Sequence, residues 1–163
     1  SIMIDKFLSY ERNPYTDAGF YDHPLIAGYW QNSRWFQLCC EVIRGFLVNS
    51  LGKTPVKQYT NDGSPSIGCV WSTATNTATV VNYFSNLGYI PTTNQHNNAW
   101  WSGGNASGIN TAINSGAFLV QHRDHGGETG WGNPSYDNSD LNGLTNTMFP
   151  FVFSSNCLTG RYD

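Results

Sequence analysis

Short apolar, strand-like segments alternate along this chain with segments whose apolar residues recur at helical spacing, and this alternation most constrains the fold. The strand-like segments span residues 24–30, 56–59, 117–120 and 148–153, and the helical segments span residues 33–51, 76–87, 107–115 and 139–146. A strand–helix–strand succession forms parallel strand pairs through right-handed crossovers. We therefore predict an α/β fold, with a mostly parallel sheet flanked by helices, in which the 163 residues form one domain.

The chain carries little charge. Asp, Glu, Lys and Arg make up 12% of the residues, and the net charge is -3. Because Lys and Arg form no run, nucleic acid is not expected as the main partner. No apolar stretch approaches the roughly 20 residues that span a bilayer. Asn, Ser, Thr and Gly supply polarity instead, which is typical of secreted proteins.

The four cysteines, Cys39, Cys40, Cys69 and Cys157, are too few for a disulfide framework. The adjacent Cys39 and Cys40 are poorly placed for two ordinary bridges. They lie on the apolar side of a helical segment, so we expect them in the core. The chain has no C-x-x-C pair and its four histidines are scattered, which argues against a zinc site.

Two polar clusters follow predicted strands, at residues 121–127 and 154–157. Ligands of an open α/β sheet bind beyond the carboxyl ends of its strands. If the two strands are neighbours, His125 and Cys157 share one crevice, and a nearby imidazolium favours the reactive thiolate of a cysteine. Glycines after His125 leave backbone amides available for an oxyanion hole. Spacing alone leaves two alternatives open, a structural thiol and a loop histidine bonded to a backbone carbonyl.

Two segments are similar to a known family. Residues 117–132, AFLVQHRDHGGETGWG, resemble the catalytic-histidine segment of the gingipain family of cysteine peptidases. Residues 144–160, LTNTMFPFVFSSNCLTG, resemble the nucleophile segment of that family. Residues 4–6 and 10–13 are similar to the helix that precedes its catalytic subdomain.

This resemblance implies a caspase-like three-layer fold and a cysteine endopeptidase that cleaves polypeptides through a thioester acyl-enzyme. It implies Cys157 as the nucleophile and His125 as its acid/base partner, with the backbone amides of Gly126 and Cys157 as the oxyanion hole. Glu128 could support the imidazolium. The resemblance further implies a secreted or cell-surface bacterial protein that needs no cofactor for catalysis, although calcium is structural in some members.

The chain also departs from the family pattern. Asp124 stands where the family has a glycine, and Trp30 and Gln31 lie where it has the carboxylate that orients the histidine. The acid of the specificity pocket cannot be placed, so a preference for basic residues does not transfer. We expect residues 1–163 to form a catalytic subdomain truncated at both ends, with missing flanking segments of the same protein as partners. Exposed edge strands would favour self-association.

Two other functions stay open from the sequence, a non-catalytic and possibly glycan-binding module, and an inactive fragment on a peptidase-like scaffold. Trp100 and Trp101 could stack on a sugar, although packing on the sheet is the favoured role. His122 is expected to pack or to form hydrogen bonds rather than to act in chemistry. Asp137 and Asp140 could hold calcium, but two acids in a loop more often stabilise a turn.

Overall fold

The computed structural model describes residues 1–63, 70–92 and 101–161. Four parallel strands form its central sheet, in the order β2-β1-β3-β7. They are β1 (Leu25–Trp30), β2 (Val56–Asn61), β3 (Leu119–Arg123) and β7 (Phe151–Ser155). The four predicted strands and their parallel pairing are confirmed, with shifts of a few residues at the ends.

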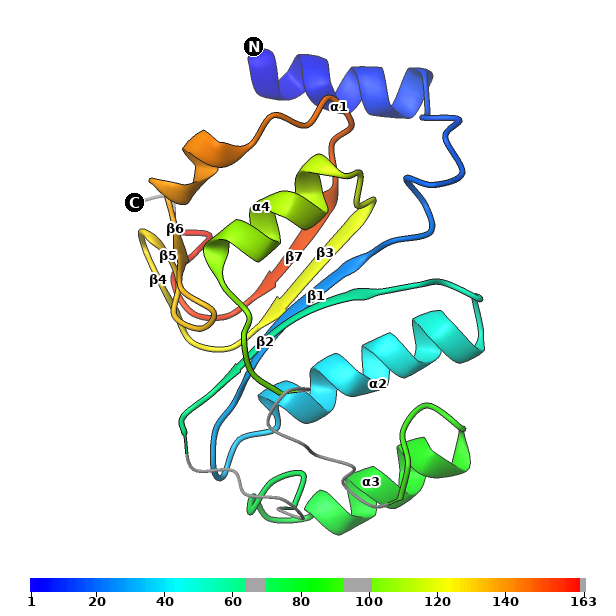
Figure 1. The fold of residues 1–163 in the computed structure, drawn as a ribbon, viewed down its shortest axis with the longest axis vertical. Coiled ribbons are helices and arrows are strands. Elements are labelled where there is room, and N and C mark those ends of the chain that lie inside the picture. Colours follow the sequence, from blue (N-terminus) through cyan, green and yellow to red (C-terminus); the bar gives the residue numbers. More distant parts are fainter. Residues whose placement is uncertain (64–69, 93–100, 162–163) are drawn as a thin grey trace.

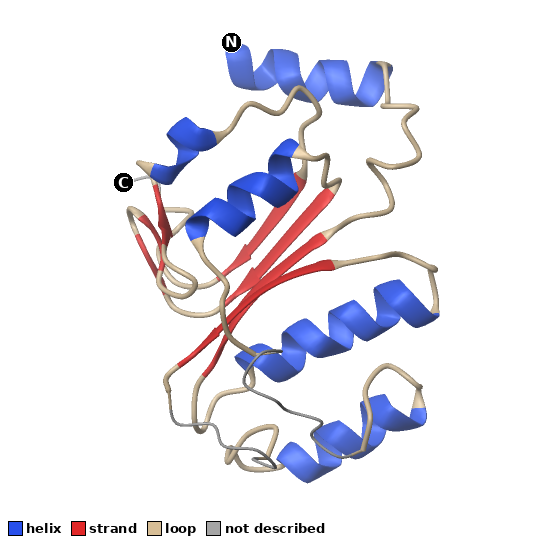
Figure 2. Cartoon of the chain, in the orientation of Figure 1, coloured by secondary structure: helices blue, strands red, loops and turns tan. Residues whose placement is uncertain are grey.

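Helices cover both faces of the sheet (Figures 1 and 2). They are α1 (Ile2–Arg12), α2 (Phe36–Asn49), α3 (Thr77–Asn86) and α4 (Ala106–Asn114). Helix α4 lies on one face and α2 on the other, while α3 packs on the outer side of α2. The predicted α/β class with a helix–sheet–helix arrangement is confirmed. No helix in the described ranges is long and apolar enough to cross a membrane.

Alternation along β1 separates two cores. Leu25 packs with Ile109 and Ile113 of α4, whereas the next residue, Ile26, packs with Cys40 of α2. Successive side chains of a strand point to opposite faces, so one short apolar strand serves both layers. A third cluster joins α2, α3 and the loops around them, and its buried members are Trp30, Leu38, Trp71, Val81, Ile90 and Trp101.

The predicted helix at residues 139–146 is wrong. Only a short 3-10 helix, η1 (Asp140–Gly143), forms there. Side chains of α4 tether this segment: Asn110 and Asn114 donate to the carbonyl oxygens of Asp140 and Gly143, each at 2.9 Å. These hydrogen bonds from a distant helix replace the internal backbone hydrogen bonds that a longer helix would form.

A small antiparallel sheet, absent from the sequence prediction, lies at the carboxyl ends of the main strands (Figure 1). Its strands are β4 (Gly126–Gly127), β5 (Gly130–Trp131) and β6 (Tyr136–Asp137). Strands of two residues carry no detectable alternation, so periodicity could not have predicted them.

A buried acid links α2 to the sheet. Glu41 is 0% exposed. Its carboxylate accepts from Arg44 of the same helix, at 2.9 Å, and from the Tyr59 hydroxyl of β2, also at 2.9 Å. Loss of one donor leaves a buried acceptor partly unsatisfied, which costs about 1–3 kcal/mol.

We predict that Tyr59→Phe lowers the free energy of unfolding by about 1–3 kcal/mol, because it removes a single buried hydrogen bond to Glu41. Urea denaturation followed by circular dichroism measures this change. Tyr83→Phe is the matched control, since Tyr83 is exposed on α3, and it should stay within about 0.5 kcal/mol of the wild type. Equal effects of the two variants would contradict the importance of this contact.

Candidate active site

The two polar clusters predicted from the sequence meet at the carboxyl ends of β3 and β7. These strands are neighbours and parallel, and their register pairs His122 with Ser154 and Arg123 with Ser155. Each pair is separated by 32 residues, which is also the separation of His125 and Cys157. His125 and Cys157 lie in the two loops that follow β3 and β7. Arg123 reinforces the pairing by donating from Nη1 to the carbonyl oxygen of Ser155 at 2.6 Å.

The two loops are in direct contact at Gly126. A Cβ added to this glycine would lie 2.8 Å from Cγ of Asn156 and 3.0 Å from the carbonyl oxygen of Cys157. No side chain fits at such distances, so the close approach of the histidine loop to the cysteine turn requires glycine at position 126.

Cys157 is the exposed cysteine among the three in the described ranges. Burial raises the pKa of the Cys39 thiol and raises that of Cys40 well above its ordinary value. Cys40 is fully buried and Cys39 half-buried, close to the predicted core placement. Cys69 lies outside the described residues. Cys157 therefore has the solvent access that a nucleophile needs, and the other two thiols do not.

His125 is exposed, and the residue that follows β1 orients its imidazole ring. Its Nε2 lies 2.8 Å from Oε1 of Gln31, which follows β1 directly. The ring of Phe36, at the start of α2, meets the imidazole edge-to-face with centroids 5.1 Å apart. The sequence indicated that no acid stands beside Trp30, and the structure places a side-chain amide there as acceptor. The oxygen of a side-chain amide accepts a hydrogen bond as a carboxylate does, so Gln31 can orient the ring.

Asp124, which directly precedes His125, is 1% exposed. In the described part of the chain neither of its carboxylate oxygens has a partner in hydrogen-bond geometry. Burial raises the pKa of Asp124, and the nearby backbone of His125 and Asn133 offsets part of that rise. The carboxyl points into the protein and away from solvent, so it adds no exposed charge beside His125.

Three other acids have structural partners. Glu128 is exposed and forms an ion pair with Arg161 at 2.5 Å. Asp137 accepts from the backbone and hydroxyl of Ser139, and Asp140 accepts from the backbone amide of Asp137 at 2.8 Å. Among the residues that the structure describes, no group of three or more His, Cys, Asp or Glu side chains could hold a metal ion. The hydrogen bonds of Asp137 and Asp140 stabilise the turn between β6 and η1.

Two aromatic predictions concern packing. Trp101 is fully buried and packs on Trp71 with ring centroids 5.5 Å apart, so it is no exposed platform for a sugar. Trp100 lies outside the described residues. His122 is fully buried within β3 and stacks on Trp131, with centroids 4.2 Å apart and rings within 2° of parallel. The expected packing roles of Trp101 and His122 are confirmed.

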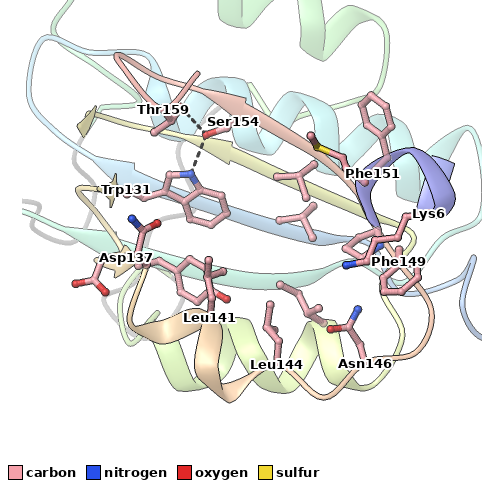
Figure 3. Close-up of a pocket in the computed structure, with 18 of the residues that line it drawn as sticks. Lys6, Trp131, Asp137, Leu141, Leu144, Asn146, Phe149, Phe151, Ser154 and Thr159 are labelled. Carbon is pink, nitrogen blue, oxygen red and sulfur yellow. Dashed lines mark hydrogen bonds between the residues drawn. The ribbon is translucent and has the colours of Figure 1, made fainter. Parts of the chain in front are cut away.

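An open groove of about 700 Å³ runs beside this site, along the β7 edge of the sheet and under α1 (Figure 3). Apolar side chains such as Phe7, Leu144 and Phe151 line most of it, and Lys6 Nζ lies 4.5 Å from the centre of the Phe149 ring. Its lining includes Ser154 but neither His125 nor Cys157. The groove is therefore adjacent to the cysteine turn and separate from the histidine–cysteine pair.

A solved structure shares this fold. The crystal structure of the Arg-specific cysteine proteinase gingipain R aligns with 96% of this chain at a TM-score of 0.59 and 22% sequence identity. This similarity shows the fold class, a caspase-like α/β domain. This chain spans 28% of that structure's chain.

Sequence comparison gives the family. A profile of peptidase family C25 matches residues 1–163. The chain belongs to peptidase family C25, a family of cysteine peptidases. Gingipain R2 of Porphyromonas gingivalis is 36% identical over 52 residues, which cover 31% of this chain and 7% of that protein.

We predict that Gly126→Ala and Gly127→Ala differ sharply, although the two glycines are adjacent. The first methyl group would collide with Asn156 and displace the Cys157 turn, and overpacking of this kind costs about 1–3 kcal/mol. The second methyl group meets no atom within 4 Å and should cost about 0.5 kcal/mol or less. Urea denaturation and the alkylation rate of Cys157 measure both effects. Indistinguishable variants would mean that the two loops do not touch.

Proposed function

We propose that this chain carries the catalytic dyad of a cysteine endopeptidase, with Cys157 as nucleophile and His125 as acid/base. The observation that carries the proposal is the parallel pairing of β3 and β7, because the loops that follow them carry His125 and the exposed Cys157 and are in contact at Gly126. Membership of peptidase family C25 supports the same chemistry.

The proposed reaction has two stages. His125 takes the thiol proton of Cys157, Sγ attacks the carbonyl carbon of a peptide bond, the carbon–nitrogen bond breaks, and His125 delivers that proton to the departing amine. The product is a thioester between the acyl group and Cys157. His125 then takes a proton from water, whose oxygen attacks the thioester carbonyl. The carbon–sulfur bond breaks, and His125 returns the proton to Sγ as the acid is released.

Gln31 defines which nitrogen of His125 is basic in this proposal. An amide oxygen only accepts hydrogen bonds, so Nε2, which faces Oε1 of Gln31 at 2.8 Å, carries the proton. Nδ1 then keeps its lone pair and is the nitrogen that serves Cys157. In this proposal the neutral amide of Gln31 orients His125, as a carboxylate orients the histidine in the family pattern.

Backbone amides of Gly126 and Cys157 are proposed to bind the oxyanion of the tetrahedral intermediate. Gly126 can contribute because its missing side chain lets the backbone lie against the cysteine turn. Glu128 supports the site indirectly. Its ion pair with Arg161 joins the hairpin after His125 to the segment after Cys157.

The substrate class is a polypeptide, and the proposed steps use only protein groups and water, without a cofactor. A secreted or cell-surface bacterial location fits the relatives, and fractionation of the producing cells tests it. An enzyme found only in the cytoplasm would refute that location.

Further segments of the same protein are proposed to cover the β7 edge. Phe151, Val152 and Phe153 are each about half exposed, and α1 exposes Phe7 beside them. Hydrogen exchange tests this: the amides of β7 should become protected when the chain carries its natural flanking sequence. Unchanged exchange would contradict the covering, and protection that depends on concentration of the chain alone would indicate self-association instead.

We predict that iodoacetamide alkylates Cys157 at pH 6 at least roughly tenfold faster than in His125→Ala, because the imidazolium stabilises the thiolate. Mass spectrometry of the separated peptides distinguishes Cys157 from Cys39 and Cys40. Cleavage of a mixed peptide library should be abolished by Cys157→Ala and should fall roughly 10²–10⁴-fold in His125→Ala.

The matched control for this experiment is His23→Ala, since His23 is an exposed histidine remote from the site. His23→Ala should change neither the alkylation rate of Cys157 nor the rate of peptide cleavage. Full cleavage by Cys157→Ala would refute the assignment of the nucleophile, and unchanged alkylation in His125→Ala would refute the pairing.

We predict that Gln31→Ala lowers kcat roughly tenfold to a hundredfold, because the imidazole loses its orienting contact. KM should change little, since Gln31 orients His125 rather than the substrate. Gln31→Glu keeps an acceptor at the same reach and should retain more activity than Gln31→Ala in steady-state cleavage assays. Equal activity of the alanine variant and the wild type would show that Gln31 does not orient His125.

A further inference from the structure

A second histidine, His122, lies behind the cysteine turn and is fully buried. Both of its ring nitrogens have partners. Nδ1 lies 2.7 Å from Nδ2 of Asn156, and Nε2 lies 3.1 Å from the backbone carbonyl oxygen of Asn133. Asn156 directly precedes Cys157, so this ring contacts the turn that presents the nucleophile.

We propose that His122 is a positioning residue, whose Nε2–H tautomer fixes the side-chain amide of Asn156 and thereby the turn of Cys157. This inference rests on the proposed role of Cys157 as nucleophile and adds a device that holds it. The argument follows the direction of each hydrogen bond, starting from Asn133.

The carbonyl oxygen of Asn133 can only accept, so Nε2 of His122 carries the ring proton. Nδ1 is then an acceptor, and it takes a hydrogen bond from the amide nitrogen of Asn156. The other end of the Asn156 amide, Oδ1, therefore points away from His122. A flipped amide would require the proton on Nδ1 and would leave the lone pair of Nε2 facing a carbonyl oxygen. One backbone carbonyl thus determines the orientation of Asn156.

The oriented amide ties together both sides of the cysteine turn. Oδ1 of Asn156 accepts from the hydroxyl of Thr159 at 2.6 Å and from that of Ser154 at 3.1 Å. Ser154 precedes Cys157 and Thr159 follows it, so the contacts enclose the nucleophile. Leu158 within this turn has a φ of 62°, a left-handed conformation that a leucine holds only when its surroundings enforce it.

Trp131 of β5 fixes the plane of the His122 ring. The two rings stack with centroids 4.2 Å apart and planes within 2°. The indole Nε1 donates to the Ser154 hydroxyl at 2.8 Å, and Figure 3 shows Trp131 and Thr159 both directed at Ser154. Burial lowers the pKa of His122 to about 4, which keeps the ring neutral at ordinary pH.

The decisive variants separate the nitrogens of His122 from its ring. His122→Phe keeps an aromatic ring on Trp131 and removes both hydrogen bonds. We expect kcat to fall about tenfold or more with KM within about twofold, because a displaced nucleophile harms the chemical step and not substrate binding. His122→Asn returns an acceptor near the position of Nδ1 and should recover part of this loss. His23→Phe is the matched control and should behave as the wild type.

Nuclear magnetic resonance tests the hydrogen-bond direction without catalysis. Long-range ¹⁵N correlation spectra at pH 7 should show His122 as the Nε2–H tautomer, and the side-chain amide of Asn156 should shift in Thr159→Val. An Nδ1–H tautomer, or an Asn156 amide that does not respond, would overturn the inference. If His122→Phe does not fold, Thr159→Val provides the kinetic test instead, and its kcat should fall with an unchanged KM.

The outcomes distinguish this inference from the proposed function. If His125→Ala loses activity while folded His122→Phe matches the wild type, the positioning role fails and the dyad stands. If Cys157→Ala cleaves normally, the proposed catalytic dyad is refuted. The tautomer of His122 then decides by itself whether the hydrogen bonds from His122 through Asn156 exist as described.

Discussion

Parallel pairing of β3 with β1 on one side and β7 on the other is the constraint on which this structure depends. Gln31 follows β1, His125 follows β3 and Cys157 follows β7. Neighbouring strands lie about 4.8 Å apart, so three residues that are distant in sequence arrive at one edge of the sheet. A slip of one residue between β3 and β7 would exchange the faces of every side chain in the moved strand. The pairing of the strands therefore also determines which of the proposed catalytic residues come to lie near one another.

Neutral polar side chains organise this edge. Gln31 orients His125, and Asn156, Ser154 and Thr159 enclose the cysteine turn. Charged groups also contribute, since Arg123 donates to the carbonyl oxygen of Ser155 and Glu128 pairs with Arg161. The chain has 12% charged residues and abundant Asn, Ser and Thr, and the side chains that form the site reflect this composition. Amides both donate and accept, so they can connect groups in a definite direction, as Asn156 does between His122 and Thr159.

The sequence predicted the fold class well because its strands are short, apolar and bounded by polar residues. Asn105, a residue type that favours helix N-termini, caps α4, since its side chain accepts from the backbone amide of Gly108 at 2.9 Å. The η1 segment was not predictable, because side chains of α4 some thirty residues away determine its shape. The sequence placed His125 and Cys157 after two strands, and the pairing of β3 with β7 shows that these strands are neighbours.

Two contacts at the site were not foreseen in full, for physical reasons. The sequence indicated Trp30 and Gln31 as the position of the group that orients the histidine, but it did not identify the amide of Gln31 as the acceptor. Gln31 and His125 are 94 residues apart, and the pairing of β1 with β3 brings them together. His122 is an unremarkable strand residue in sequence, and its partners Asn133 and Asn156 come from two different loops. Periodicity reports which face a residue occupies, but it does not report which loops close over that face.

The amide of Gln31 has one consequence that a carboxylate would not share. It carries no charge, so its hold on His125 is not weakened by dissolved salt and does not disappear when the surroundings become acidic enough to protonate an acid. The contact instead depends on geometry, through the short backbone path from the end of β1 to the amide oxygen. The orientation of His125 by Gln31 is thus maintained by strand placement rather than by attraction between opposite charges.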